Sequence, residues 1–230
     1  MGAPALLEAV EIETGPAPEA AVIWLHGLGA DGNDFAPIVP ELELPAGLAV
    51  RFVLPHAPPR PVTVNGGAVM RAWYDVLDRD GLRGEDEAGV RASQAQVEAL
   101  IEHETARGIP ARRIVLAGFS QGGAIALQTG LRHPARLAGV IGLSCYLPLA
   151  RTLAAEAAPA NRAGPIFLAH GVDDPVIPLA RARQARDRLL AAGYQVTWRE
   201  YRMPHTVCAE ELRDIAAWLS GVLRARDDRR

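Results

Sequence analysis

One serine of this sequence stands where a serine can act as a nucleophile. Ser120 is the centre of 118–122, which fits the pattern G-x-S-x-G, between an apolar run at 114–117 and a helical pattern at 121–132. A sharp strand-to-helix turn needs small neighbours, exposes the hydroxyl above the sheet and leaves helix N–H groups free for a developing oxyanion. The pattern predicts nucleophilic attack on an acyl carbon, and the alternative is a glycine turn with an incidental serine.

A nucleophilic serine also needs a base and an orienting acid, because its hydroxyl is a poor nucleophile at its free pKa. Asp173 and Asp174 follow an apolar run at 166–169, and His205 follows another at 196–201. The order serine, acid, histidine would bring these groups to one edge of a parallel sheet. Taken singly, Asp-Asp-Pro is an ordinary turn and a loop histidine is often a cap. These residues leave the choice between the two aspartates open.

The glycine-rich segment 26–32 supports two different interpretations. Its glycines spell G-x-G-x-x-G after an apolar run, which is the fingerprint of a dinucleotide site. Such a site would require a sustained helix next and a carboxylate at the end of the second strand. Here Pro37 interrupts the helix, and no carboxylate follows the run at 50–54. In the other interpretation the loop turns the Leu28 N–H toward an oxyanion above Ser120.

The elements that must position these groups alternate along the chain. Continuous apolar runs predict strands buried on both faces, and the segments between them have helical period. The predicted strands are 21–25, 50–54, 114–117, 140–143, 166–169 and 196–201, and the predicted helices are about 87–107, 121–132, 179–192 and 212–223. This alternation predicts an α/β fold with a mostly parallel central sheet and helices on both faces.

No internal repeat or domain-scale linker interrupts this alternation. We therefore expect a single domain over residues 1–230, with its core at about 20–222 and a charged, solvated C-terminal tail at 224–230. The longest stretch without clear periodicity is 55–86, which is rich in Pro, Gly and Arg, and a loop of that length in a compact domain is usually either functional or disordered. Only a short segment separates Pro148 from Ile166, which is too little for a large lid domain.

Composition excludes several classes of chemistry. All 24 basic residues are arginine, so Schiff-base, P-loop and Ser-Lys mechanisms lack their amine. A net charge of −3 argues against nucleic acid as a partner. The two cysteines, the absence of a secretory pattern and the lack of a membrane-length apolar run lead us to expect a soluble cytoplasmic protein. No metal-ligand spacing occurs, and we expect neither metal nor cofactor; homodimerisation is left open.

Several motifs, in the same order along about residues 20–222, resemble the phospholipase/carboxylesterase family, which includes bacterial carboxylesterases and acyl-protein thioesterases. The matching segments are 25–32, 71–75, 118–123, 143–148, 170–178 and the loop of His205. The resemblance implies a small α/β-hydrolase fold without a large lid domain. It also implies a catalytic Ser120, Asp174 and His205, with Asp174 chosen because the family's acid precedes the Pro-x-x-Pro stretch. The oxyanion hole would come from the Leu28 and Gln121 amides.

The sequence departs from the family at Pro204, where the family often has glycine. Proline fixes φ and removes an N–H, so the geometry of the His205 loop is the detail this substitution puts in question. For the substrate pocket we select aromatic and apolar residues near the motifs. Each of them could instead belong to the hydrophobic core. The candidate pocket residues are Trp73, Phe119, Tyr146, Leu147 and Val176.

These features together predict a serine carboxylic ester hydrolase that acts on short to medium acyl esters through an acyl-enzyme. On the same residues, a lysophospholipase or an acyl-protein thioesterase is the alternative. From other classes, an NAD(P)-binding oxidoreductase and a non-catalytic α/β scaffold remain. The partner is a small-molecule ester or thioester. With no lysine, charged recognition of the substrate would fall to arginine, first to Arg60 and Arg71 in the long loop.

Overall fold

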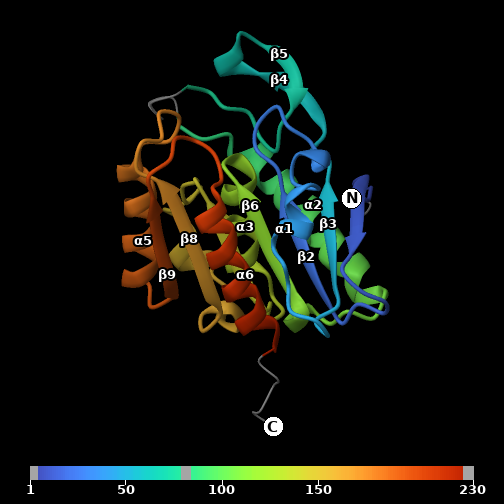
Figure 1. The fold of residues 1–230 in the computed structure, drawn as a ribbon. Coiled ribbons are helices and arrows are strands. Elements are labelled where there is room, and N and C mark those ends of the chain that lie inside the picture. Colours follow the sequence, from blue (N-terminus) through green and yellow to red (C-terminus); the bar gives the residue numbers. More distant parts are fainter. Residues whose placement is uncertain (1–4, 79–83, 225–230) are drawn as a thin grey trace.

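The computed structural model describes residues 5–78 and 84–224 and has one central sheet covered by helices (Figure 1). The strands are β1 (Ala9–Glu13), β2 (Ala20–Leu25), β3 (Val50–Pro55), β4 (Pro59–Val62), β5 (Ala68–Arg71), β6 (Ile114–Phe119), β7 (Gly139–Leu143), β8 (Pro165–Gly171) and β9 (Gln195–Tyr201). The α-helices are α1 (Ile38–Glu41), α2 (Glu87–Ala106), α3 (Gln121–Arg132), α4 (Leu153–Glu156), α5 (Leu179–Ala191) and α6 (Ala209–Arg224).

The main sheet has the strand order β1-β3-β2-β6-β7-β8-β9. Every pairing from β3 to β9 is parallel, and only β1 runs antiparallel to its neighbour. Because parallel strands all end at one edge, the loops after β2, β6, β8 and β9 gather there. The α/β-hydrolase architecture expected from the sequence is confirmed, and residues 144–164 between β7 and β8 hold only short helical turns in place of a lid domain.

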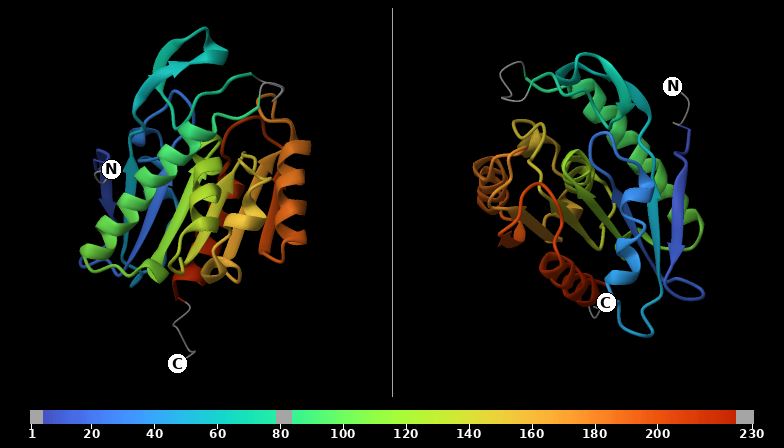
Figure 2. Two further views of the ribbon diagram at one scale, coloured as in Figure 1. Left: turned by 180° about the vertical axis from the view of Figure 1, so that it is seen from behind. Right: turned by 45° about the horizontal axis from the view of Figure 1, so that its top comes forward.

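Helices cover the two faces of the sheet unequally. α2, α3 and α5 pack on one face, and α1 and α6 pack on the other (Figures 1 and 2). Each face of the sheet has its own hydrophobic core, and the central strands contribute side chains to both. In β2, Ile23 belongs to the core under α2, α3 and α5, and Trp24 to the core under α1 and α6. This two-sided burial explains why the strands read as continuous apolar runs in the sequence. Within the described residues, no helix is both long and apolar enough to cross a membrane.

Two strand-forming segments were not predicted from the sequence. β1 lies before the expected core, and its apolar Val10 and Ile12 alternate with Glu11 and Glu13, a pattern of period two rather than a continuous run. The stretch 55–86 contains the two-stranded sheet β4–β5, which projects beyond the main sheet at the top of Figure 1. β4 contains prolines, which in a sequence pattern argue against a strand. The strand forms nevertheless, because edge strands tolerate proline. The predicted tail beyond residue 224 lies outside the described residues.

Candidate active site

Ser120 lies on the sharp turn between β6 and α3. Its backbone has φ 54° and ψ −119°, in the left-handed half of conformational space, and its N–H donates to Leu143 O at 2.8 Å. The turn leaves no room for side chains on either flank. A Cβ added at Gly118 would lie 2.4 Å from the Gly122 backbone, and one added at Gly122 would lie 2.2 Å from Leu25 O. The small neighbours expected from the sequence are therefore a steric requirement of this turn.

His205 lies between Ser120 and Asp174. Its Nε2 is 2.9 Å from Ser120 Oγ, and its Nδ1 is 2.6 Å from Asp174 Oδ2. Since the carboxylate accepts, Nδ1 carries the proton and Nε2 is free to accept the Ser120 hydroxyl proton. The Phe119 ring packs beside the imidazole, with the ring centroids 4.7 Å apart. Pro204 therefore does not divert the His205 side chain from the serine.

Asp174 is the buried member of the aspartate pair, and Asp173 is exposed. The second Asp174 oxygen, Oδ1, accepts the backbone N–H groups of Val176 and Ile177 at 2.8 and 2.9 Å. These bonds fix the carboxylate and leave Oδ2 for the His205 ring. Buried His170 also lies near Asp174, where burial lowers the pKa of its imidazole and favours the neutral form.

The two backbone groups expected to bind an oxyanion border the same cavity as Ser120. Leu28 follows β2 and Gln121 opens α3, and both residues line that cavity. Across the part of the chain that the structure describes, neither backbone N–H donates to a protein atom. The first N–H groups of a helix lack intrahelical partners, so the Gln121 N–H is available to a ligand oxygen.

The cavity has a volume of about 900 Å³ and contains both Ser120 and His205 in its wall. Four of the five candidate pocket residues also line it, namely Phe119, Tyr146, Leu147 and Val176. The fifth prediction, Trp73, is wrong: this side chain is fully buried behind the site, where its indole N–H donates to His26 O at 2.9 Å. A buried indole needs a hydrogen-bond acceptor, and a backbone carbonyl supplies it here.

The cavity wall also contains contacts between polar groups that the sequence did not predict. Tyr74 Oη and Tyr146 Oη lie 2.8 Å apart, and the Arg181 guanidinium lies 4.3 Å from the centroid of the Tyr146 ring. Among the described residues, the arginines at the cavity are Arg151, Arg181 and Arg188. Arg60 and Arg71 do not line it. The Arg71 guanidinium donates to Ala57 O, and the Arg60 guanidinium lies against Gly89 at the start of α2.

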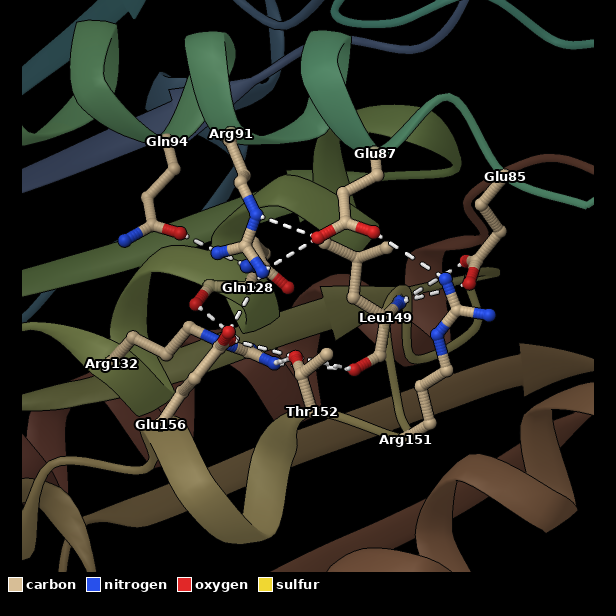
Figure 3. A network of polar contacts seen from close by, with 10 residues as sticks. All are labelled: Glu85, Glu87, Arg91, Gln94, Gln128, Arg132, Leu149, Arg151, Thr152 and Glu156. Carbon is tan, nitrogen blue, oxygen red and sulfur yellow. Dashed lines mark hydrogen bonds and ion pairs between the residues drawn. The ribbon is translucent and has the colours of Figure 1, made fainter.

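A polar network fastens two walls of the cavity to the helices beneath them (Figure 3). The Glu85 carboxylate accepts the Leu149 N–H, which links the segment before α2 to the loop after β7. Glu156 in α4 binds Arg91 of α2 and Arg132 of α3, both at 2.7 Å. These hydrogen bonds lower the pKa of the Glu156 carboxyl to about 2. Such pairings join positions far apart in sequence, so spacing gives no signal of them.

Among the described residues, one group has side chains close enough together to share a metal ion. Glu11, His103 and Glu104 form it. The Arg107 guanidinium binds both of its carboxylates, at 2.7 and 2.8 Å, and therefore already supplies the positive charge that a cation would bring. None of these residues lines the cavity that contains Ser120.

Known proteins resemble this chain over nearly its whole length. The family model described as Phospholipase/Carboxylesterase matches residues 7–223. Acyl-protein thioesterase 1 of Neurospora crassa is 44% identical over 211 residues, which cover 87% of this chain and 86% of that protein. Acyl-protein thioesterase 1 of Mycosarcoma maydis is 41% identical over 228 residues, covering 93% and 95% of the two chains.

A solved structure agrees with these sequence matches. The crystal structure of Zea mays acyl-protein thioesterase 2 superimposes with a TM-score of 0.82 at 31% identity, covering 94% of this chain and 100% of that one. The sequence relatives and the solved structure therefore point to the same kind of enzyme, one that hydrolyses ester or thioester bonds. On this agreement, the chain belongs to the phospholipase/carboxylesterase family and is an ester or thioester hydrolase.

Proposed function

We propose that the protein hydrolyses acyl esters or thioesters through an acyl-enzyme formed on Ser120, with His205 as general base and Asp174 as the orienting acid. The observation that carries this proposal is the continuous chain of contacts from Ser120 Oγ to His205 Nε2 at 2.9 Å and from His205 Nδ1 to Asp174 Oδ2 at 2.6 Å. This is the geometry in which a serine, a base and an acid act as one nucleophilic unit.

In the acylation step, the bond from Ser120 Oγ to the carbonyl carbon forms while the hydroxyl proton passes to His205 Nε2. Asp174 holds the imidazole in the tautomer that can accept this proton and stabilises the imidazolium. The carbonyl oxygen becomes an oxyanion between the Leu28 and Gln121 N–H groups, each of which contributes about 3 kcal/mol to lowering the barrier. His205 then protonates the departing alkoxide or thiolate, and the bond to the leaving group breaks.

In the deacylation step, a water molecule takes the place of the leaving group. His205 removes a proton from this water as its oxygen attacks the acyl carbon, and the same two N–H groups bind the second oxyanion. Collapse of that intermediate breaks the bond to Ser120 Oγ and returns the proton to the serine. The free carboxylic acid leaves, and every group in the site regains its starting state.

Short to medium acyl esters are the first candidate class of substrate for this site. The cavity of about 900 Å³ lies within the range that holds small organic ligands, and Val176 presents an apolar side chain at it that is 62% exposed. A second candidate, hydrolysis of acyl-protein thioesters, is favoured by the 44% identity to a protein that bears that name. Both candidates use the same attack by Ser120 and differ in acyl length and leaving group.

The assignment of the nucleophile is tested with Ser120→Ala. We expect this variant to remain folded and to lose hydrolysis of a short p-nitrophenyl ester by at least about 10⁴-fold in kcat. Ser220→Ala is the matched control, since within the described residues the Ser220 hydroxyl donates to Ala216 O of its own helix, α6. A fluorophosphonate probe should label the wild type and the control but not Ser120→Ala. Turnover retained in Ser120→Ala would refute the proposal.

The substrate class is tested on the wild type with p-nitrophenyl esters from acetate to palmitate, and with an S-acylated peptide beside its O-acyl analogue. A maximum of kcat/KM at two to eight acyl carbons supports the short to medium ester class. A maximum at palmitate together with a preference for the S-acylated peptide supports the thioesterase. Because both measurements use one enzyme preparation, differences in folding do not enter the comparison.

A further inference from the structure

The two proposed oxyanion donors come from segments that are far apart in the sequence. Leu28 belongs to the loop after β2 and Gln121 to the start of α3. Neither segment alone determines the distance between the two N–H groups, and this distance must match one oxygen atom. Trp73, just after β5, contacts both segments. Its indole N–H donates to His26 O at 2.9 Å, and its backbone N–H donates to Gln121 Oε1 at 2.7 Å.

On the Leu28 side, hydrogen bonds fix the plane of the peptide that carries the donor. Ala57 N–H donates to His26 Nε2 at 3.0 Å, so Nδ1 carries the ring proton and donates to Gly27 O at 2.7 Å. Burial lowers the pKa of His26 and keeps this neutral tautomer. In a trans peptide the C=O and the following N–H point in opposite directions, so the Leu28 N–H points away from the His26 ring.

This loop lies directly against the nucleophile. A Cβ added at Gly27 would lie 3.3 Å from the Phe119 ring and 3.5 Å from Ser120 Cβ. The loop is also tied to the strand before Trp73, because the Gly29 N–H donates to Arg71 O at 2.9 Å. Any shift of the segment 71–73 would therefore move the Leu28 N–H relative to Ser120.

On the Gln121 side, the side chain is held at both ends. Its Oε1 accepts the Trp73 N–H, and its Nε2 donates to Tyr74 O at 2.7 Å. The same residue supplies the second proposed oxyanion donor through its own backbone N–H. We call the contacts of Trp73 with His26 O and with the Gln121 side chain the clamp. The Ser93 hydroxyl of α2 donates to Trp73 O, so the clamp is also anchored to a helix of the main core.

We propose that Trp73 is a positioning residue that holds the two oxyanion donors at their working separation. This inference rests on the proposed function, since it presumes attack by Ser120 and an oxyanion held by Leu28 and Gln121. Trp73 does not touch the substrate, because its side chain is fully buried and does not line the cavity. Its action is confined to the two steps, acylation and deacylation, in which the carbonyl oxygen gains charge. The clamp therefore contributes to kcat and little to the binding of the ground state.

The first test replaces the indole but keeps an aromatic ring, as Trp73→Phe. Trp24→Phe is the matched control, because Trp24 is equally buried, lies two residues from His26, and has an indole N–H without a hydrogen-bond partner in the described chain. Both substitutions remove the same volume. We expect Trp73→Phe to lower kcat by about 10- to 100-fold with KM within about twofold, and Trp24→Phe to leave both within about twofold.

The second measurement separates oxyanion binding from general loss of structure. A thionoester forms a sulfur anion that accepts hydrogen bonds weakly, so the ratio of kcat/KM for an ester to that for its thionoester reports the strength of the oxyanion donors. We expect Trp73→Phe to lower this ratio by about tenfold and Trp24→Phe to leave it unchanged. A purely structural defect would lower both activities equally and keep the ratio constant.

Gln121→Met provides an independent route, because it removes both side-chain bonds of the clamp and retains the backbone N–H. We expect it to lower the same ratio, and the double variant with Trp73→Phe to lose less than the product of the two single effects. An unchanged ratio in either folded variant overturns the inference. If Ser120→Ala stays active, the proposed function fails instead, so the two failures are distinguished.

Discussion

Asp173 and Asp174 are adjacent carboxylates with opposite environments. Asp174 is buried and accepts two backbone N–H groups on one oxygen and the His205 ring on the other, whereas Asp173 is exposed. Sequence alone does not separate them, because both follow the same strand and precede the same proline. The difference arises from the turn, which directs one side chain into the site and the other to solvent.

This contrast gives a prediction with an internal control. Asp174→Asn should lower kcat by about 10⁴-fold, because an amide at this position no longer holds the imidazole in the tautomer that accepts the serine proton. Asp173→Asn should leave kcat within about twofold. Steady-state hydrolysis of a p-nitrophenyl ester measures both variants. Equal losses in the two variants would argue against the proposed role of Asp174.

Glu211, in the first turn of α6, is a fully buried carboxyl group that the proposed reaction does not use. Burial raises its pKa from 4.5 to about 8. Between these two values the unfolded chain loses the proton while the folded chain retains it, so this group makes the folded state less stable as pH rises. Its stabilising contribution is complete below about pH 4.5 and is lost by about pH 8.

Glu211→Gln should therefore be more stable than the wild type at pH 8 by about 2 kcal/mol or more, and near equal to it at pH 4.5, since one pKa unit corresponds to about 1.4 kcal/mol. Urea unfolding at both pH values checks this. A difference between the two proteins that is constant with pH would show that the carboxyl ionises in the folded state as it does in the unfolded one.

Most of the residues of the proposed site could be found from the sequence. Ser120 stands in a recognisable turn, and Asp174 and His205 each follow an apolar run. Trp73 and Arg71 were expected at the substrate but do not line the cavity, because residue type alone does not distinguish a side chain in the cavity wall from one packed behind it. The pairings of Glu85 with Leu149 and of Arg181 with Tyr146 were missed because they join loops whose relative positions depend on the finished fold.

Among the elements, the turn from β6 into α3 carries a strict steric requirement. Ala in place of Gly122 would put its Cβ against the Leu25 and His26 carbonyl oxygens, which belong to the backbone and cannot turn aside. A Cβ added at Gly221 in α6 meets open space. The same substitution at these two helical glycines should therefore have opposite effects.

We expect Gly122→Ala to lower the free energy of unfolding by about 1–3 kcal/mol or more, through overpacking. Gly221→Ala should raise it by about 0.5 kcal/mol, because alanine loses less conformational entropy in a helix. Chemical denaturation of the two variants tests the pair. A stable Gly122→Ala variant would mean that α3 can move away from the end of β2, contrary to the close approach of Gly122 to the Leu25 carbonyl.

At the scale of elements, the predicted helices begin and end close to those of the structure, except that α6 begins at Ala209, one turn earlier. The missed strands share a physical cause. β1 buries one face only and β4 contains prolines, so neither has the continuous apolar run by which the central strands were found.

For the whole molecule, the sequence predicted the class of fold but not the order of its strands. The central strands are apolar on both faces, so their side chains do not specify which neighbour each one pairs with. The observed order places β6, β8 and β9 on one half of the sheet, with β7 between the first two. The proposed nucleophile, acid and base follow these three strands in turn.

The order of the strands along the chain also bears on when activity can appear. Ser120 and His205 are 85 positions apart, and β9 emerges from the ribosome after β6, β7 and β8. A nascent chain that has emerged through β8 holds the proposed nucleophile and acid without the proposed base, and should leave esters intact. In refolding from denaturant, hydrolysis should return only once β9 amides are protected from hydrogen exchange, and earlier activity would contradict this. On the proposed mechanism, the growing polypeptide would therefore not act on acylated substrates before β9 and the His205 loop are in place.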